Sequence, residues 1–535
     1  MLEGGERTAL SRRQFLRRSG AAVAAVGSGA VLGPLLAACG GPGRSPATTG
    51  AVRTSTTSGG PADWSALAAT LGPGSRLVTP DDVAYGTDKL LYNERFDDID
   101  PAAIAYCASP ADVQRCVDFA RRHGLPLAAR SGGHSYAGYS LTSGLVVDVT
   151  PMASVRPGPG GTATVGAGTR LIDLYAVLGP TGRLVPGGSC PTVGIAGLTL
   201  GGGVGVVGRK FGLTCDNVAS LEIVTADGVL RTASPTSGSD LYWACRGGGG
   251  GNFGIVTSFT FTTHPIPPLA LFTLEWPFGA AAEVLDGWLH WTGGTPPELW
   301  SNCQLLSASS GNEVKVTGVY CGDPATLSGL LQPLEQAVPA GTTDRFVGPE
   351  SYLDAMLIEA GCEGSTVAQC HLPSQNPAGT LSRATFAAKS AYLRSPLPSP
   401  GVDAVVGAVT DLQAHLPELG GGFVFDAYGG AIGAVAPDAT AFAHRDALTG
   451  IEYSYSWSPG APDQLVAGGR QWLDEAQQDL APSSVGAYVN YMDPTQPDWP
   501  QAYYGTNLPR LVQVKRAVDP DDLFSFAQSV PTRLP

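Results

Sequence analysis

The chain has 535 residues, of which 43% are hydrophobic, and this is enough for two or more domains with sizeable cores. Its formal net charge of −14 argues against nucleic acid and against an anionic membrane surface as partners. The 72 glycines and 43 prolines are many, but they stay below the range typical of disordered proteins. No internal apolar run is long enough to span a bilayer.

The first 39 residues have the pattern of an export signal. Ser11-Arg12-Arg13-Gln14-Phe15-Leu16 matches a twin-arginine signal, and an Ala/Val/Gly-rich segment follows. Leu36-Ala37-Ala38-Cys39 resembles a lipobox, which would make Cys39 a lipidated first residue; the alternative is cleavage at a nearby alanine. The sequence therefore predicts export by the twin-arginine route, either to the cell envelope through a lipid anchor or to the medium. This route carries folded proteins, often with a cofactor already bound. Residues 40–75 are predicted to be a flexible Gly/Ser/Thr/Pro linker.

An α+β domain is predicted over residues 98–268. Ser109 and Pro110 are typical of a helix start and Gly124 of its end, and apolar residues recur between them at helical spacing. A second helix is expected over residues 171–178 and a short one over 240–244. Asp227-Gly228 predicts the turn of a hairpin. Strands are expected over residues 103–109, 125–130, 145–149 and 162–168.

A second α+β domain is predicted over residues 269–480, after the proline-rich boundary at residues 264–268. Strand-like runs alternate there with helix-like runs. The expected strands are 271–276, 313–322, 421–430 and 451–457, and the expected helices are 281–293 and 325–338.

The stretch from Gly187 to Asn217 is unusually rich in glycine and almost free of charge before Arg209. Glycine disfavours both helices and strands, so this stretch is predicted to bring backbone close to a flat or phosphorylated ligand. Residues 203–208 spell G-x-G-x-x-G, and Asp227 follows about twenty residues later, as in a Rossmann dinucleotide site. A β-branched strand does not precede this motif, which makes the Rossmann alternative the weaker one.

Three motifs in order and at matching spacing carry a more specific signal. They are Arg130-Ser131-Gly132-Gly133-His134-Ser135, Gly188-Ser189-Cys190-Pro191-Thr192-Val193-Gly194 and Tyr488-Val489-Asn490-Tyr491. Together they resemble the berberine-bridge-enzyme-like family of FAD oxidoreductases, in the vanillyl-alcohol-oxidase superfamily. The resemblance implies an α+β fold with a two-part PCMH-type FAD-binding domain. It also implies a substrate-binding domain with an antiparallel sheet, and a segment over residues 481–535 that returns to the FAD domain.

The resemblance further implies FAD held by two covalent bonds, from His134 to the flavin 8α-methyl group and from Cys190 to flavin C6. An imidazole nitrogen and a thiolate are nucleophiles that can add to an electron-poor ring. Backbone N–H groups of the first motif are expected at the FAD pyrophosphate. The other implied cofactor-binding residues are Arg130, Ser131, Gly132, Gly133, Ser135, Gly188, Ser189, Thr192, Val193, Gly194, Gly197, Gly203, Gly254, Val256, Tyr488 and Asn490. No cluster of Cys and His has metal-ligand spacing.

Catalytic roles also follow from the resemblance. Tyr491 takes the position of the family's catalytic base, and because a free phenol has a pKa near ~10, it needs help to accept a proton at neutral pH. Asp426 matches an assisting carboxylate of carbohydrate-oxidising relatives, and Tyr136 matches a position near the flavin face. Val193 resembles a gatekeeper that admits O₂, which favours an oxidase.

The predicted function is an exported FAD-dependent alcohol oxidase. It would oxidise a sugar or oligosaccharide lactol, or a secondary-metabolite hydroxyl, by hydride transfer to flavin N5, with O₂ as acceptor and H₂O₂ as product. One alternative is a dehydrogenase that uses a quinone or a redox protein, and another is a non-catalytic surface binding protein. Among the ten cysteines, either Cys107 with Cys116 or Cys362 with Cys370 can close a disulfide after export.

Overall fold

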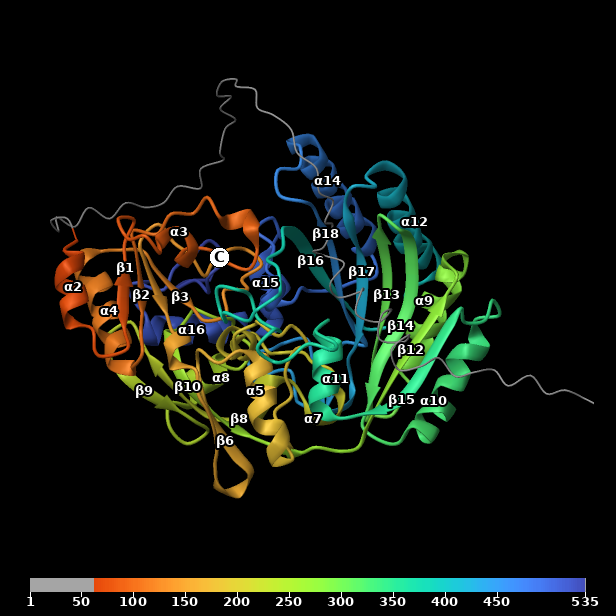
Figure 1. The fold of residues 1–535 in the computed structure, drawn as a ribbon, viewed down its shortest axis with the longest axis horizontal. Coiled ribbons are helices and arrows are strands. Elements are labelled where there is room, and N and C mark those ends of the chain that lie inside the picture. Colours follow the sequence, from red (N-terminus) through yellow and green to blue (C-terminus); the bar gives the residue numbers. More distant parts are fainter. Residues whose placement is uncertain (1–61, 535) are drawn as a thin grey trace, which may run out of the picture.

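The structure, a computed structural model, describes residues 62–534, which fold into two halves (Figure 1). A cavity lies between the halves. The predicted signal segment, Cys39 and the linker up to residue 61 lie outside the described residues. The linker prediction was too long at its C-terminal end, because Trp64–Thr70 form helix α2 inside it. Leu67 on this helix is buried against α4, so the folded part begins near Trp64.

A four-stranded sheet begins the first half. In spatial order its strands are β1 (Arg76–Val78), β2 (Ala103–Tyr106), β4 (Leu145–Asp148) and β3 (Leu127–Arg130). The last three strands run parallel, and α4 (Pro110–His123) makes the connection between β2 and β3. The Ser109 side chain accepts the Asp112 N–H, and Gly124 closes the helix in the left-handed conformation, as the sequence predicts. A short helix, α3 (Tyr85–Asp88), follows β1.

An antiparallel five-stranded sheet completes the first half. Its strands, in spatial order, are β5 (Val155–Pro157), β6 (Thr162–Gly166), β10 (Ile255–Thr262), β8 (Val218–Val224) and β9 (Leu230–Ala233). The predicted helices are α5 (Leu171–Leu178) and α8 (Ser239–Ala244). A two-stranded pair, β7 (Arg183–Leu184) with β11 (His264–Pro265), lies at the domain boundary.

The glycine-rich stretch is more helical than expected. It holds α6 (Ile195–Leu200) and α7 (Gly208–Phe211), both too short to be ordinary helices. Gly203–Gly208 follows α6 rather than a strand, and Asp227 forms an ion pair with Arg231 at 2.7 Å on the surface. A Rossmann site needs a strand before its glycines and a free ribose-binding acid, so the Rossmann alternative is wrong.

A seven-stranded antiparallel sheet organises the second half and confirms the predicted α+β class. Its strands, in spatial order, are β15 (Asp344–Glu350), β12 (Leu269–Trp276), β14 (Gly311–Tyr320), β13 (Leu299–Ala308), β17 (Gly420–Ala427), β18 (Thr449–Ser456) and β16 (Phe386–Leu393). Four of them match predicted strands, whereas β13, β15 and β16 were not predicted.

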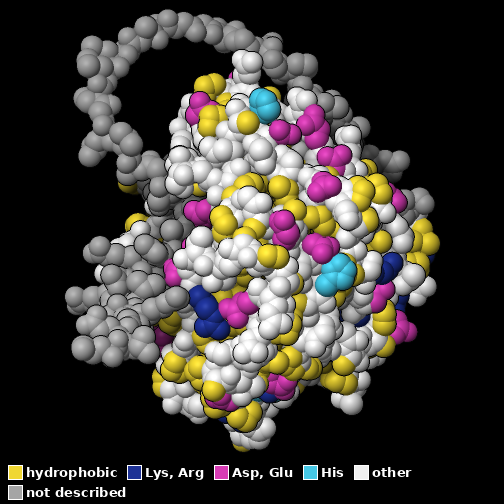
Figure 2. Space-filling view, turned by 90° about the vertical axis from the view of Figure 1, so that its right-hand side faces the viewer, with side chains coloured by type: hydrophobic (Ala, Val, Ile, Leu, Met, Phe, Trp, Pro, Cys, Tyr) yellow, Lys and Arg dark blue, Asp and Glu magenta, His cyan; other side chains and the backbone are white. Residues whose placement is uncertain are grey.

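Four long helices cover one face of this sheet (Figure 1). They are α9 (Ala281–Thr292), α10 (Pro324–Ala337), α12 (Ser399–His415) and α14 (Asp463–Leu480). The outer surface of this helix layer carries scattered acidic side chains and few Lys or Arg, in keeping with the net charge of −14 (Figure 2). On the inner side, strand residues alternate: Cys303 and Leu305 are fully buried on the helix side, whereas Asn302 and Gln304 face the cavity.

The chain ends against the first half. After α14 come a 3₁₀ turn (Val489–Tyr491), α15 (Trp499–Tyr504) and α16 (Leu508–Val518), and α16 packs on α8. The fully buried Lys515 ammonium donates to the Asn252 carbonyl at 3.0 Å and pairs with Asp519 at 2.7 Å. This satisfied charge fixes the C-terminal segment to the first half.

Two further helices and one disulfide complete the fold. Helix α11 (Tyr352–Glu359) precedes a loop closed by Cys362–Cys370, one of the two predicted pairs, and α13 (Gly430–Gly433) follows β17. Cys107 and Cys116 are buried free thiols whose sulfurs lie 3.7 Å apart. Among residues 62–534, no helix combines the length and apolarity needed to cross a membrane.

Candidate active site

A cavity of about 600 Å³ separates the two halves. One wall is formed by the loops after β3 and around α6, together with residues 250–256. The opposite wall is the open face of the seven-stranded sheet, and residues 488–492 close one side. The first wall is therefore largely backbone and the second largely side chains.

The backbone wall depends on two glycines that touch. A Cβ atom on Gly132 would lie 2.1 Å from the Gly194 nitrogen, and one on Gly194 would lie 2.3 Å from the Gly132 nitrogen. No side chain fits at either position, so the first and second motifs meet only as glycines. Gly197 is different: a Cβ there would meet no protein atom within 4 Å and would enter the cavity.

Arg130 supplies a buried cation to the same wall. Its guanidinium pairs with Asp148 and lies 3.2 Å from the Tyr106 hydroxyl, while Nη1 is buried without a hydrogen-bond partner. Buried donors normally have partners, so an orphaned guanidinium nitrogen beside a glycine-lined cavity fits an anionic ligand such as a pyrophosphate. The residues present on this wall thus fit FAD.

His134 and Cys190 both line this wall. The His134 ring stacks on Tyr92 at 4.1 Å, and its Nε2 lies 2.7 Å from the Thr192 hydroxyl. Burial, with some help from Arg170, lowers the pKa of His134 to about 3, so the ring is neutral at pH 7. Cys190 is exposed to the cavity, yet desolvation raises the pKa of its thiol to about 11.

Most of the predicted cofactor-binding residues line the cavity. They are Arg130, Ser131, Gly132, Gly133, His134, Ser135, Gly188, Ser189, Cys190, Val193, Gly194, Gly197, Val256, Tyr488 and Asn490. Thr192, Gly203 and Gly254 lie behind the wall instead. Thr192 holds His134, the Gly203 N–H donates to the Tyr488 hydroxyl at 2.9 Å, and Gly254 packs against the Val224 carbonyl. These three residues support the wall rather than form it.

Two tyrosines and one glutamate meet where the two walls join. The rings of Tyr136 and Tyr491 stack at 4.8 Å, and the Tyr136 hydroxyl donates to a Glu452 carboxylate oxygen at 2.9 Å. The Tyr491 phenol lies near the same carboxylate. Desolvation raises the pKa of Glu452 to about 7, even though both phenols oppose the shift. Burial, and then the Glu452 charge, hold the pKa of Tyr491 well above 10.

Asp426 and Glu359 also face the cavity but make no side-chain hydrogen bond to the described residues. Desolvation raises the pKa of each carboxyl to about 7, and their negative neighbours add to the shift. Asp426 sits directly across the β13–β17 pair from Asn302. The Asn302 Oδ1 accepts from Gln304 at 3.0 Å and from Thr317 at 2.8 Å, which leaves its amide nitrogen free to bind a ligand.

Sequence reasoning missed Glu452, Glu359 and Asn302. Glu452 lies within a predicted strand, where alternation places Glu452 and Ser454 on one face and Ile451, Tyr453 and Tyr455 on the other. That pattern is also typical of a solvent-facing strand surface. These polar positions become a cavity wall only because the first half of the molecule covers them. Asn302 lies on the unpredicted β13, and Glu359 ends the unpredicted α11.

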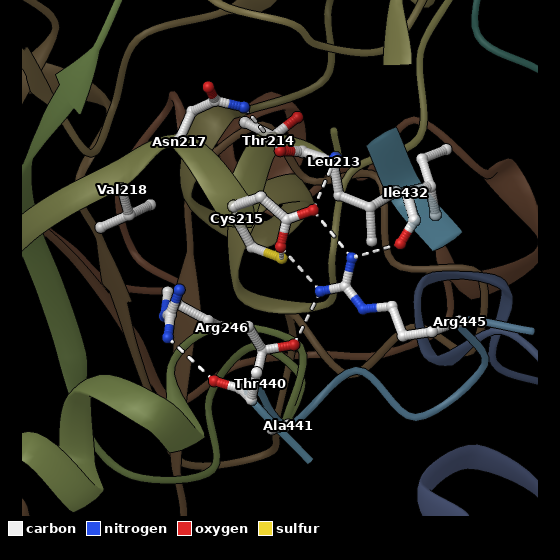
Figure 3. A network of polar contacts seen from close by, with 12 residues as sticks. Leu213, Thr214, Cys215, Asn217, Val218, Arg246, Ile432, Thr440, Ala441 and Arg445 are labelled. Atoms are coloured by element: carbon white, nitrogen blue, oxygen red, sulfur yellow. Dashed lines mark hydrogen bonds and ion pairs between the residues drawn. The ribbon is translucent and has the colours of Figure 1, made fainter. Parts of the chain in front are cut away.

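A buried ion pair between Arg445 and Asp216 joins the loop before β18 to the glycine-rich stretch (Figure 3). Arg445, in the loop before β18, donates to both carboxylate oxygens of Asp216 at 2.7 Å and to the Thr440 hydroxyl. Asp216 in turn accepts the Leu213 N–H, and the neighbouring Thr214 N–H donates to the Gly203 carbonyl. Because Gly203 holds Tyr488, whose ring packs edge-on against Tyr491, this network joins the two halves beside the cavity.

The site offers proton transfer but no protein ligands for a metal. Within the described part of the chain, no group of three or more His, Cys, Asp or Glu side chains is placed to hold a metal ion. The cavity instead sets a flat, glycine-lined wall opposite carboxylates and phenols. This arrangement suits a bound organic cofactor facing a hydroxyl-bearing substrate.

Comparison with known proteins agrees with this geometry. A family model described as "FAD binding domain" matches residues 101–234, and one described as "Berberine and berberine like" matches residues 487–531. The chain is 34% identical to an uncharacterized FAD-linked oxidoreductase of Bacillus subtilis, over 85% of this chain and 96% of that protein. It is 32% identical to a xylooligosaccharide oxidase of Thermothelomyces thermophilus, over 83% and 90%. The BBE-like 1 structure from Physcomitrella patens matches with a TM-score of 0.80 at 31% identity, covering 88% of this chain and all of that one.

Proposed function

This chain belongs to the berberine-bridge-enzyme-like family of FAD-dependent oxidoreductases, and from this premise we propose that it is an exported carbohydrate oxidase with FAD attached to both His134 and Cys190. The observation that carries the proposal is the Tyr136–Glu452–Tyr491 cluster, which lines the same cavity as His134 and Cys190. Such a cluster can take a proton from the hydroxyl group of a substrate that is bound next to the cofactor.

The flavin wall holds the two attachment residues in different protonation states. His134 is neutral, and when its Nε2 donates to Thr192, Nδ1 keeps the lone pair needed to bond the flavin. The Cys190 thiol is protonated at neutral pH, so its bond requires removal of a proton. Arg130 would pair with the pyrophosphate, and Gly197 leaves room for the ring system.

Proton removal is the task of the tyrosines and carboxylates that line the cavity. Bound FAD would supply hydride acceptance, and O₂ would reoxidise it with release of H₂O₂. Tyr491 would receive the substrate hydroxyl proton, and Glu452, whose carboxylate both tyrosines contact, would take it up in turn. Because the pKa of Glu452 is about 7, this carboxylate is available as a base at neutral pH, whereas an unassisted phenolate is not. Asp426, farther along the same face, remains the second candidate for this role.

The open face of the sheet favours a polyhydroxylated substrate. The Asn302 amide nitrogen and the Asp426 carboxylate make no hydrogen bond to the described residues, and the two residues lie opposite each other on the paired strands β13 and β17. Such groups bind hydroxyls in pairs, and similarity to a xylooligosaccharide oxidase supports a sugar or oligosaccharide lactol. Val193 lines the cavity beside Cys190 and supports O₂ as acceptor over a quinone. The twin-arginine motif supports export, and Cys39 supports a lipid anchor.

Two measurements test the proposal. Purified protein precipitated with acid should keep its flavin in the pellet, and so should a Cys190→Ala variant through His134 alone. A His134→Ala/Cys190→Ala double variant should release all flavin into the supernatant. The second measurement is H₂O₂ release from a panel of oligosaccharides and simple alcohols. If sugars reduce the flavin and quinones reoxidise it but air does not, the protein is a dehydrogenase. If no substrate in the panel reduces the flavin, both the oxidase and the dehydrogenase are contradicted.

A further inference from the structure

One segment of the second half, which contains the seven-stranded sheet, packs against the first half. The cover segment, residues 352–371, runs from α11 through the Cys362–Cys370 loop to His371. Its helix α11 lies beside α5 (Figure 1). The Tyr352 ring meets the Tyr175 ring edge-on at 5.9 Å. Ile358 and Glu359 of the same segment line the cavity. The cover segment therefore touches both the cavity and α5.

The start of α5 holds the loop that carries Cys190. The Leu171 N–H donates to the Val193 carbonyl at 3.0 Å, and the Ile172 N–H donates to the Pro191 carbonyl at 3.1 Å. The Ile195 N–H returns a bond to the Thr169 carbonyl at 2.9 Å. Any displacement of this end of α5 thus moves the Cys190–Val193 loop with it.

His371 joins the cover segment to α5 at the next residue, Asp173. Its Nδ1 lies 2.8 Å from the Val367 carbonyl oxygen, and its Nε2 lies 3.3 Å from the Asp173 carboxylate. Both partners are acceptors, and only an imidazolium carries a hydrogen on both ring nitrogens. A neutral ring that kept its Val367 bond would turn the Nε2 lone pair toward the carboxylate. The geometry is therefore satisfied only by the protonated form.

We propose that protonated His371 is a positioning residue, which ties the cover segment to α5 and so fixes the loop carrying Cys190 and Val193. The tie weakens as rising pH removes the ring proton. Asp173 is the anion facing the ring and Arg170, also at the start of α5, is the opposing cation. The hydrogen bond to Asp173 raises the pKa of His371 above its usual range, while burial opposes this shift. The His371–Asp173 contact therefore contributes its full stabilisation below about pH 6.5, and this stabilisation is lost as the pH rises through the raised pKa of His371.

Thermal unfolding of the flavin-loaded protein at several pH values tests the tie. A His371→Gln variant should melt about 1–3 °C below the wild type at pH 5.5, with the difference vanishing toward pH 9. His290→Gln is the matched control, because His290 is exposed on α9 and its hydrogen bond and ion pair both go to Asp286, one turn away on the same helix. A wild-type and His371→Gln difference that is the same at every pH would overturn the proposal.

Hydrogen exchange at the amides of Leu171 and Ile172 reports on the loop itself. After correction for the intrinsic effect of pH, exchange in the wild type should become several-fold faster between pH 6 and pH 9. In His371→Gln and in Asp173→Asn it should be fast at both pH values, and the double variant should be no faster than either single one. Additive losses, or wild-type protection that does not change with pH, would overturn the proposal. Neither readout depends on turnover, so both remain decisive if the proposed oxidase activity fails.

Discussion

The two walls of the cavity are built in opposite ways. The flavin-side wall is mostly backbone from glycine-rich loops, and its specificity lies in where side chains are absent, as at Gly132, Gly194 and Gly197. The substrate-side wall is one face of a β-sheet, and its specificity lies in which side chain occupies each alternate position. The first wall can hold the same cofactor in many proteins, whereas the second can change its substrate through single substitutions that leave the fold intact.

The same difference separates what each wall contributes chemically. The flavin-side wall contributes a neutral imidazole, a thiol and a partly unpaired guanidinium. The substrate-side wall contributes carboxyls whose pKa values burial raises to about 7, beside phenols. Substitutions on the flavin-side wall should therefore lower the flavin content, whereas substitutions on the substrate-side wall should lower turnover.

The largest effect is expected at Tyr491. Removing its hydroxyl in Tyr491→Phe should lower turnover about 10²–10⁴-fold, because the group that receives the substrate proton is lost. Flavin content should stay normal, as measured by the ratio of flavin to protein absorbance. Tyr488→Phe is the matched control. The Tyr488 hydroxyl accepts hydrogen bonds from the Gly203 N–H and the Asn490 amide, and removal of this hydroxyl should lower turnover far less. Equal losses in the two variants would contradict a proton-transfer role for Tyr491.

Glu452→Gln should lower turnover about 10–100-fold and change its pH dependence. A carboxylate base must be ionised, so wild-type activity should rise with pH through about 7, the pKa of Glu452. That rise should vanish in Glu452→Gln. Asp426 has a similarly raised pKa, so Asp426→Asn discriminates between the two. Loss of the rise in Asp426→Asn alone would assign the base to Asp426.

On the flavin-side wall, Gly197→Leu should reduce flavin content about tenfold, because its side chain would enter the cofactor's space at a steric cost of ~1–3 kcal/mol. The folded protein should remain, since a Cβ at Gly197 meets no protein atom. Gly329→Leu on α10 makes the same exchange at an exposed glycine with equal room and should leave flavin content unchanged. Full flavin content in Gly197→Leu would show that the cofactor does not use this wall.

The smallest effect is expected at Asn302. Asn302→Ala removes one hydrogen-bonding group facing the substrate, worth ~0.5–1.5 kcal/mol, so KM should rise about 2–10-fold with turnover little changed. Cys303, the next residue, is fully buried on the helix side of the same strand. Cys303→Ala should lower the thermal stability without changing KM. If Cys303→Ala raised KM as much as Asn302→Ala, the effect at Asn302 would come from disturbed strand packing and not from a lost contact with the substrate.

The sequence determined the local features of this protein. The α4 caps at Ser109 and Gly124, the α5 bounds and the three motifs around His134, Cys190 and Tyr491 follow from short stretches of chain. Their signals are strong because capping residues and glycines act on their immediate neighbours. The α+β class and the FAD-oxidoreductase family were predictable for the same reason.

Only the tertiary structure decided which residues meet across the cavity. Glu452 joins Tyr136 from more than three hundred residues away, and Asn302 faces Asp426 through strand pairing that no local pattern encodes. A polar face on a strand is ordinarily exposed to water; here it becomes a binding wall because another half of the chain folds over it. His371 likewise meets Asp173 only because the cover segment crosses between the halves. These contacts join residues that are distant in the sequence, and forming them costs chain entropy. They therefore depend on the packing of the whole chain, which local sequence propensities do not describe.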